Sequence, residues 1–403
     1  MNIQKQLFRL YSYEFFCNFG LAQVIWVVLM AGRGFTLGQI GVAEGFFHLV
    51  SFLGEVPSGM AADLLGRKRT LAAASGLRAL AAFCMIAGGQ GMAGVCLSFA
   101  FLALSYNMAS GTREALAYDS LLQAGCPQRY EQVSARQSGI WRATSAVCSL
   151  LTVLTLWLGW RRAYLVDGCF ALAALAIACR VQEPVVTQAQ AARQQHALRD
   201  LWPRLRRHIA LSVGFLRQNP RAGCKMLADG ALGCCATLTV MVLQQHLVQL
   251  GLGGGVMDAL LGPALLAITL AGVAGSVCAV RVKLPFGRVT ALCAGCIAAG
   301  VALAGAPRLS LALAGGALAT FWDALYEIKV SVRLNQDFPS DQRATLVSVQ
   351  SVVFSLLMLP ASPLVGAVCE AVGVTAGLAL LGAGLAAGAA VGFALYTAAL
   401  RRA

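Results

Sequence analysis

The sequence predicts an all-α membrane protein with twelve transmembrane helices in two pseudo-symmetric six-helix halves. The chain of 403 residues is 58% hydrophobic and only 12% charged, which is about half the charged share of a soluble globular protein. Its apolar runs reach the roughly 20 residues that a helix needs to cross a bilayer. Its basic residues gather at the ends of these runs, as is typical of the loops of a membrane protein.

Twelve apolar runs, each bounded by charged or turn residues, are the predicted spans. None shows the strict alternation over about ten residues that is typical of a barrel strand, so we expect helices throughout. The predicted spans are 10–31, 40–60, 70–90, 92–117, 137–158, 163–181, 226–249, 256–280, 289–306, 310–333, 344–368 and 373–399.

A polar segment divides these spans into two sets of six. Residues 183–224 begin with a glutamine-rich stretch and continue with apolar and basic positions at helical spacing, which favours a loop followed by an amphipathic helix. We therefore expect an N-terminal half over 1–182, a cytoplasmic linker over 183–224 and a C-terminal half over 225–403.

The distribution of basic residues predicts the orientation. Of the 31 lysines and arginines, 23 fall on the side of the two termini, four on the opposite side and four within spans. Because loops rich in lysine and arginine stay in the cytoplasm, we expect a multi-pass cell-membrane protein with both termini cytoplasmic.

Several other functions are disfavoured. The formal net charge is +14, but the basic residues have no interleaved aromatic residues of the kind that bind nucleic acid. The four histidines lack metal-ligand spacing, and the sequence has no Gly-x-x-x-x-Gly-Lys-Ser/Thr motif. We expect no enzymatic activity, no metal and no cofactor, and a monomer whose partners are a small-molecule substrate, protons and the lipid bilayer.

One loop carries a family motif. After the second predicted span the chain reads Gly59-Met-Ala-Ala-Asp63-Leu-Leu-Gly66-Arg67-Lys68-Arg69, preceded by Glu55-Val-Pro57. This resembles the signature loop of the major facilitator superfamily and the Glu-Ile-Pro-Thr-Gly run of one of its branches. The resemblance implies a conformational switch that latches the two halves when the outside is open. The switch residues it implies are Gly59, Asp63, Gly66, Arg67, Lys68 and Arg69.

The two halves also show a faint internal repeat. Glu114 and Glu327 are separated by 213 positions, and the same separation joins the pairs Gln137-Ser138 and Gln350-Ser351. Such repeats are common in transporter folds, where the substrate site lies near the membrane midplane at their interface.

Charged residues within spans are the main functional candidates, since each costs several kcal/mol unless it is paired or hydrated. By the resemblance, helices 1, 4, 7 and 10 line the cavity. A second interpretation stays open, namely that these charges form buried ion pairs, such as Arg113 with Glu14, that fix helix register. At the mouth of helix 7, Lys225 and Asp229 are expected to pair. The candidates for a substrate or proton pathway are Glu14, Arg113, Glu114, Asp323, Glu327, Tyr106 and Trp322.

These features together predict a secondary transporter that works by alternating access. Two carboxylates four residues apart, Asp323 and Glu327, share one helix face and suit proton coupling. The family branch and the acidic spans favour export of a small lipophilic or cationic compound. Uptake of a small polar solute remains an alternative, as does a non-transporting membrane protein or membrane enzyme.

The topology can be checked by cysteine accessibility. Single cysteines introduced between residues 186 and 197, or at Arg401 and Arg402, should react only with a reagent that reaches the cytoplasm. Cysteines in the 251–255 loop should react from outside intact cells. External labelling of the linker would contradict this orientation.

Overall fold

The computed structural model describes residues 2–184, 219–252, 258–337 and 343–402, with single positions between 203 and 218. Within these segments the side chains at 56, 59–64, 258–259, 335–337, 343–348 and 389–402 are not described. Most of the predicted linker, 183–224, therefore lies outside the described residues.

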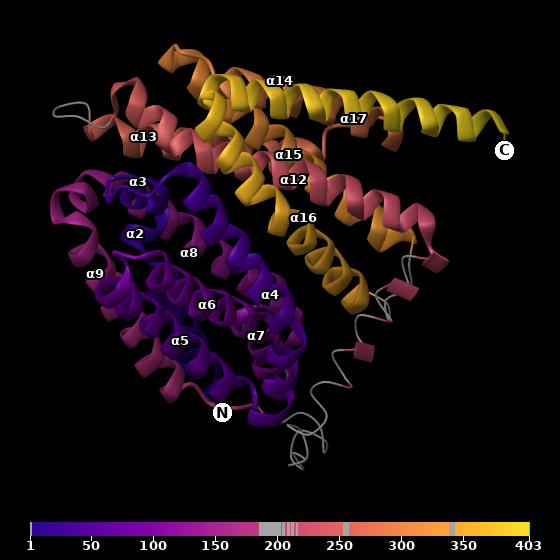
Figure 1. Ribbon diagram of the computed structural model, residues 1–403. Helices are drawn as coiled ribbons and strands as arrows, with labels where there is room; N and C mark the ends of the chain where they lie inside the picture. Colours follow the sequence, from indigo (N-terminus) through magenta and orange to yellow (C-terminus); the bar gives the residue numbers. More distant parts are fainter. Residues whose placement is uncertain are drawn as a thin grey trace. The chain divides into compact units, whose positions relative to one another are not determined.

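The described chain is helical and contains no strand, and its helices follow the predicted spans (Figure 1). Nine of its helical segments are long and apolar enough to cross a membrane. The helices that match the second to sixth spans are α4 (Leu37–Leu65), α5 (Arg67–Gly88), α6 (Met92–Ala109), α7 (Thr112–Gln123), α8 (Tyr130–Leu150) and α9 (Thr152–Arg180). Those of the second half are α12 (Pro220–Leu247), α13 (Asp258–Ala279), α14 (Phe286–Ala304), α15 (Leu309–Asp337), α16 (Arg343–Val372) and α17 (Val374–Arg402).

Three spans of the first half are not the simple helices that the hydropathy pattern predicts. The first span is divided into α1 (Ile3–Asn18), α2 (Leu21–Val24) and α3 (Trp26–Ala31). The fourth is broken between α6 and α7, where Gly111 has a φ of +70°, a conformation that favours glycine. Within α9, Gly159 has a φ of 73° and separates the end of the fifth span from the sixth.

The chain forms two compact units. The first consists of residues 1–26 and 46–211, and the second of residues 27–45 and 212–403. The first third of α4 thus belongs to the second unit and the rest of it to the first.

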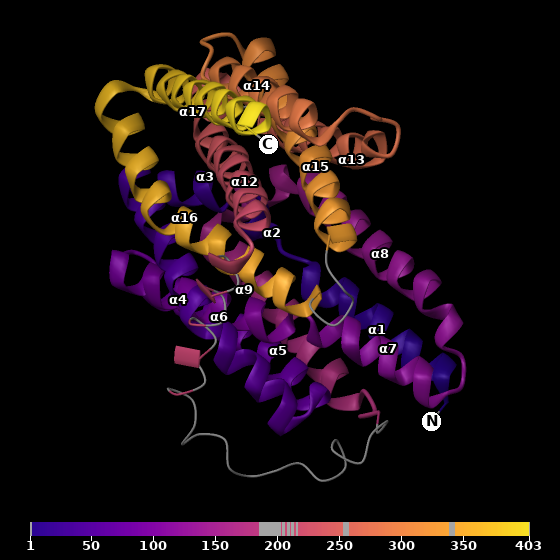
Figure 2. The same ribbon diagram turned by 90° about the vertical axis from the view of Figure 1, so that its right-hand side faces the viewer.

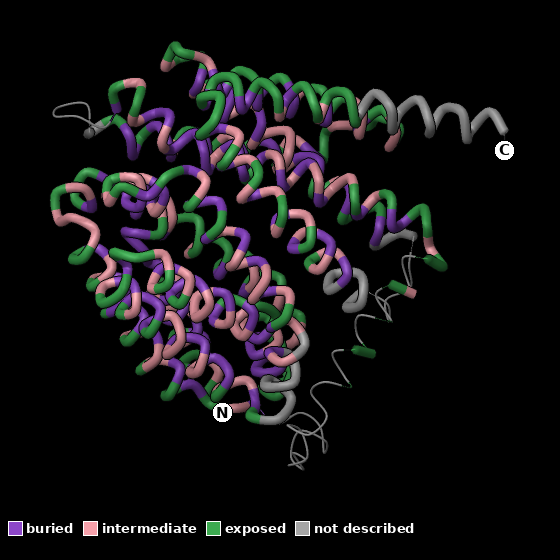
Figure 3. Tube along the Cα trace, in the orientation of Figure 1, coloured by how far each residue is buried: buried purple, intermediate pink, exposed green. Residues whose placement is uncertain are grey.

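The core of the first unit lies where α1, α5, α7, α8 and α9 meet. α5 packs against both α6 and α9 (Figure 1). The buried residues of this core include Leu10 and Tyr13 of α1, Leu71 of α5 and Leu116 of α7. Buried and exposed residues recur in turn along the described helices and are not separated into one buried and one exposed end (Figure 3). This is expected for helices that bury one side against their neighbours.

Glycine permits the close helix packing of the second unit. α14 packs against α15 and α17 (Figure 2). A Cβ at Gly300 of α14 would lie 2.6 Å from the backbone nitrogen of Ala319, and one at Gly315 of α15 would lie 2.2 Å from that of Ala304. Within the same unit, Gly41 of α4 lies so close to α16 that a Cβ would meet the carbonyl oxygen of Ser362 at 2.2 Å. Small residues at these points let backbones approach, as in membrane helix pairs generally.

The α14–α15 contact gives a direct test of this packing. Gly300→Ala should lower the thermal stability of the purified protein by an amount equivalent to about 1–3 kcal/mol, because the added methyl group overpacks the interface. Gly295→Ala, on the same helix, is the matched control, since a Cβ there meets nothing within 4 Å. Equal melting temperatures for the two variants would contradict the packing described.

Candidate functional site

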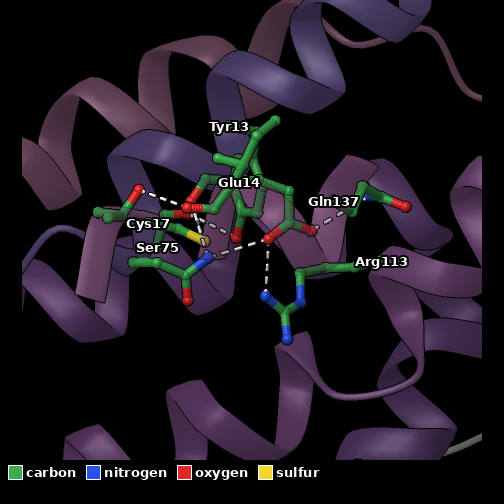
Figure 4. Close-up of polar contacts among 9 residues, drawn as sticks. Tyr13, Glu14, Cys17, Ser75, Arg113 and Gln137 are labelled. Carbon is green, nitrogen blue, oxygen red and sulfur yellow. Dashed lines mark hydrogen bonds and ion pairs between the residues drawn. The ribbon is translucent and has the colours of Figure 1, made fainter. Parts of the chain in front are cut away.

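A buried carboxylate joins three helices of the first unit. Glu14 of α1 has only 4% of its surface exposed. Its oxygens accept hydrogen bonds from Arg113 Nη1 at 3.0 Å, from Gln137 Nε2 at 3.2 Å and from Asn18 Nδ2 at 2.9 Å. Figure 4 shows Arg113 and Gln137 converging on this carboxylate from α7 and α8. Glu14 therefore connects the first, fourth and fifth spans.

This arrangement satisfies the electrostatic demands of a charge inside a membrane. A buried carboxylate needs a cation and hydrogen-bond donors to offset the loss of hydration, and Glu14 has both. The Arg113–Glu14 pair named above as a structural alternative is therefore present. Arg113 keeps one buried donor, Nε, that has no hydrogen-bond partner among the described residues.

A second polar cluster supports the break in the first span, and hydropathy reasoning missed it. Asp167 of α9 accepts hydrogen bonds from the backbone nitrogens of Leu21 at 2.6 Å and Ala22 at 3.1 Å. Beside it, the Cys148 sulfur accepts one from Gly20 N at 3.5 Å. These bonds satisfy N–H groups that a broken helix leaves without partners. The only sequence signal was a lone Asp within the sixth span.

The second unit holds a group of carboxylates on facing helices. Asp323 and Glu327 of α15 interact electrostatically with each other and with Asp229 of α12. A Cβ at Gly233, one turn beyond Asp229, would lie 3.7 Å from Asp323 Oδ1, so Asp323 faces this part of α12. Among the described residues, none of the three carboxylates forms an ion pair.

The surroundings of Asp229 correct one expectation. In place of the predicted ion pair with Lys225, Asp229 Oδ2 accepts a hydrogen bond from Gln350 Nε2 of α16. The Lys225 amine lies 5.5 Å from the centre of the Phe286 ring.

The remaining pathway candidates differ in their surroundings. Glu114, next to Arg113, is exposed and interacts electrostatically with Arg113 and Glu14. Tyr106 is 62% exposed on α6, with its ring centre 6.3 Å from that of Phe47. Trp322 packs edge-on against Phe321 at 5.5 Å. The structure thus joins Glu14 with Arg113, with Glu114 beside them, and Asp323 with Glu327. Among the side-chain contacts described, Tyr106 and Trp322 make only aromatic ones.

The described part of the signature loop is fastened within the first unit. Gly66 adopts a φ of +86° between α4 and α5. Arg67 pairs with Asp119 of α7 and donates to the Ala115 carbonyl. Glu183 Oε1 and Oε2 accept hydrogen bonds from the backbone nitrogens of Arg67 at 2.9 Å and Lys68 at 2.7 Å, which caps the start of α5.

The other predicted switch residues contribute less to this contact. Arg69 is exposed, and the side-chain positions of Gly59 and Asp63 lie outside the described residues. In the second half the cation is on the helix and the acceptor is in the loop, the reverse of the first half. Lys329 of α15 donates to the Val282 carbonyl at 2.5 Å. In each half, a cation thus joins the fourth helix of that half to the loop before the third.

The helical fold and its apolar spans are those of a polytopic membrane protein. The sequence profile described as Major Facilitator Superfamily matches residues 13–361. The chain belongs to this superfamily, which confirms the resemblance of the signature loop. No curated protein matches the chain by sequence.

Solved structures with the same fold are transporters of several kinds. A mutant of the nucleoside transporter NupG is 16% identical with a TM-score of 0.77, covering 98% of this chain and 99% of that one. The human organic anion transporter MFSD10 (TETRAN) is 16% identical with a TM-score of 0.64, covering 96% and 99%. A bacterial homolog of the human lysosomal transporter Spinster, inward-facing and occupied, is 14% identical with a TM-score of 0.69, covering 98% and 96%. At these identities the likeness establishes the fold alone.

The Glu14–Arg113 pair can be tested by a double-mutant cycle. Arg113→Ala should destabilise the protein by about 2 kcal/mol or more, because it leaves a buried carboxylate without its cation. Glu14→Gln in the same chain should recover much of this loss, since a neutral amide needs no cation. Thermal unfolding of the four proteins in detergent gives the coupling free energy. Additive losses would show that the two side chains do not interact.

Proposed function

We propose that the protein is a proton-coupled secondary transporter that works by alternating access, with Asp323 and Glu327 as its proton carriers. The observation that supports this most is the different pairing of the two acidic groups. Glu14 has Arg113 as its cation, whereas Asp323 and Glu327 have no cation partner among the described residues. A carboxylate without a cation can gain and lose a proton at smaller cost than one held in an ion pair.

The position of the two carboxylates also supports the proposal. They lie one turn apart on α15, so a proton or a ligand at one of them changes the charge felt by the other. A carboxylate that passes from water to a low-dielectric environment gains a proton. A transporter that opens and closes a cavity around Asp323 would therefore protonate this carboxylate on one side of the membrane and release the proton on the other.

The same chemistry favours a cationic cargo. Two carboxylates without a cation partner attract a positively charged or lipophilic cationic compound, and a proton competes for the same oxygens. Competition for one site couples the two fluxes in opposite directions, which gives export driven by proton entry. With the orientation predicted from the basic loops, we place the transporter in the cell membrane as a monomer with cytoplasmic termini.

A flux experiment tests this proposal. Purified protein is reconstituted into vesicles with a preformed pH gradient reported by a fluorescent dye, and a panel of lipophilic cations and neutral polar solutes is added. We expect at least one cation to dissipate the gradient with the wild-type protein. Made one at a time, Asp323→Asn and Glu327→Gln should each abolish this proton movement. The carboxylate that remains in each variant should still bind the labelled compound and so retain its exchange down its own gradient.

Glu131→Gln is the matched control, because Glu131 is exposed in the first turn of α8 and lies in the other unit from Asp323 and Glu327. Its proton flux should equal that of the wild type. Proton flux that persists in both Asp323→Asn and Glu327→Gln would overturn the assignment of the carriers. Solute uptake without any proton movement would overturn the coupling itself and favour the uptake of a polar solute.

A further inference from the structure

Two glutamines at repeat-related positions each bind a carboxylate in the first helix of their own half. Gln137 of α8 donates to Glu14 Oε1 of α1, and Gln350 of α16 donates to Asp229 Oδ2 of α12. The two glutamines are separated by 213 positions, the separation of the internal repeat. The same hydrogen bond thus occurs in both units and links the fifth helix of each half to its first.

The two bonds differ in what else binds the carboxylate. In the first half Arg113 supplies a cation to Glu14. The position 213 residues after Arg113 is Tyr326, which is 1% exposed and whose hydroxyl lies 3.3 Å from Thr290 Oγ1 of α14. The repeat therefore replaces the cation with a neutral side chain that is engaged elsewhere.

The charged groups around Asp229 do not supply a substitute. From α15, Glu327, Asp323 and the Tyr326 hydroxyl act on it electrostatically. From α16 its partner is the neutral amide of Gln350, and on α12 itself Lys225 lies against the Phe286 ring. From α14 and α17, no charged side chain among the described residues contacts it. Asp229 thus lies among acidic neighbours and one amide.

An amide is suited to a carboxylate that changes its protonation state. The NH2 group of glutamine donates to an ionised carboxylate, and its carbonyl oxygen accepts from a protonated one after the amide turns over. An arginine can only donate and so favours the ionised form alone. Gln350 can therefore stay bonded to Asp229 in both states, whereas Arg113 favours only the ionised form of Glu14.

We propose that Asp229, held by Gln350, is a further coupling carboxylate of the second half, and that Gln350 is the positioning residue for it. The proposal rests on the proposed function, in which the second half carries the protons. Gln137, by contrast, has a structural role, because its carboxylate already has a permanent cation.

Protonation can be followed without a transported compound. A hydrophobic carbodiimide reacts with protonated carboxyl groups, and mass spectrometry of the digested protein locates the product. Purified protein is labelled over a series of pH values. In the wild type we expect Asp229 to be labelled increasingly as pH falls and Glu14 to stay unlabelled over the same range.

The glutamine variants test the positioning role. Gln350→Ala should move the pH midpoint of Asp229 labelling, whereas the matched change Gln137→Ala should leave it unmoved. Asp229→Asn, a nearly isosteric change, should abolish only this label and reduce proton flux in the vesicle assay. Thermal unfolding of each variant identifies any that fail to fold.

The outcomes separate this proposal from the one on which it rests. If Asp229 is not labelled at any pH, or if both glutamine variants leave the pH midpoint of its labelling unchanged, the proposed role of Asp229 and Gln350 is wrong. If Asp323 and Glu327 nevertheless show pH-dependent labelling and proton flux, the proposed function stands without Asp229. Absence of proton flux in the wild type overturns the proposed function itself.

Discussion

The buried carboxylate of Glu14 is the point on which the first half depends. Hydrocarbon offers no hydrogen bonds, so a charge within it is stable only where the protein supplies every partner. Arg113 and Gln137 supply them from two other helices, and this requirement fixes the rotation of α1, α7 and α8 about their axes. The hydrophobic contacts of Leu10 and Leu116 fill the space between these helices, but apolar burial is non-directional, whereas hydrogen bonds to the carboxylate are directional.

The same constraint explains where the helices of this half are interrupted. A break inside the membrane exposes backbone N–H groups, and it persists only where side chains accept their hydrogen bonds. Asp167 accepts those of Leu21 and Ala22 at the break in the first span. Glu183 accepts those at the start of α5. Each acceptor lies on α9 or just beyond its end, so one helix holds the irregular backbone of two others.

Hydropathy was sufficient to predict the helical spans, because the cost of placing a residue in lipid is local and adds up along the chain. The family was predicted from the signature loop, whose motif is continuous in the sequence. The pairs of side chains that contact each other between helices were harder to predict. Arg113 with Glu14 could be named as one option, since few charges lie within spans. Asp119 as the partner of Arg67, and Gln350 as that of Asp229, depend on which helix faces meet, and hydropathy does not determine this.

The two halves therefore share a framework and differ in charge. Both link the fifth helix to the first through a glutamine and a carboxylate. Both also join the fourth helix to the loop before the third helix through a cation. The replacement of Arg113 by Tyr326 at the repeat position removes the cation from only one of the two carboxylate sites. An ion pair within a membrane resists a change of protonation because breaking it strands the remaining charge. A carboxylate bonded to an amide does not meet this obstacle. The repeat thus leaves one carboxylate site with a cation and the other without one. This difference fits the function proposed above, in which the second half carries the protons.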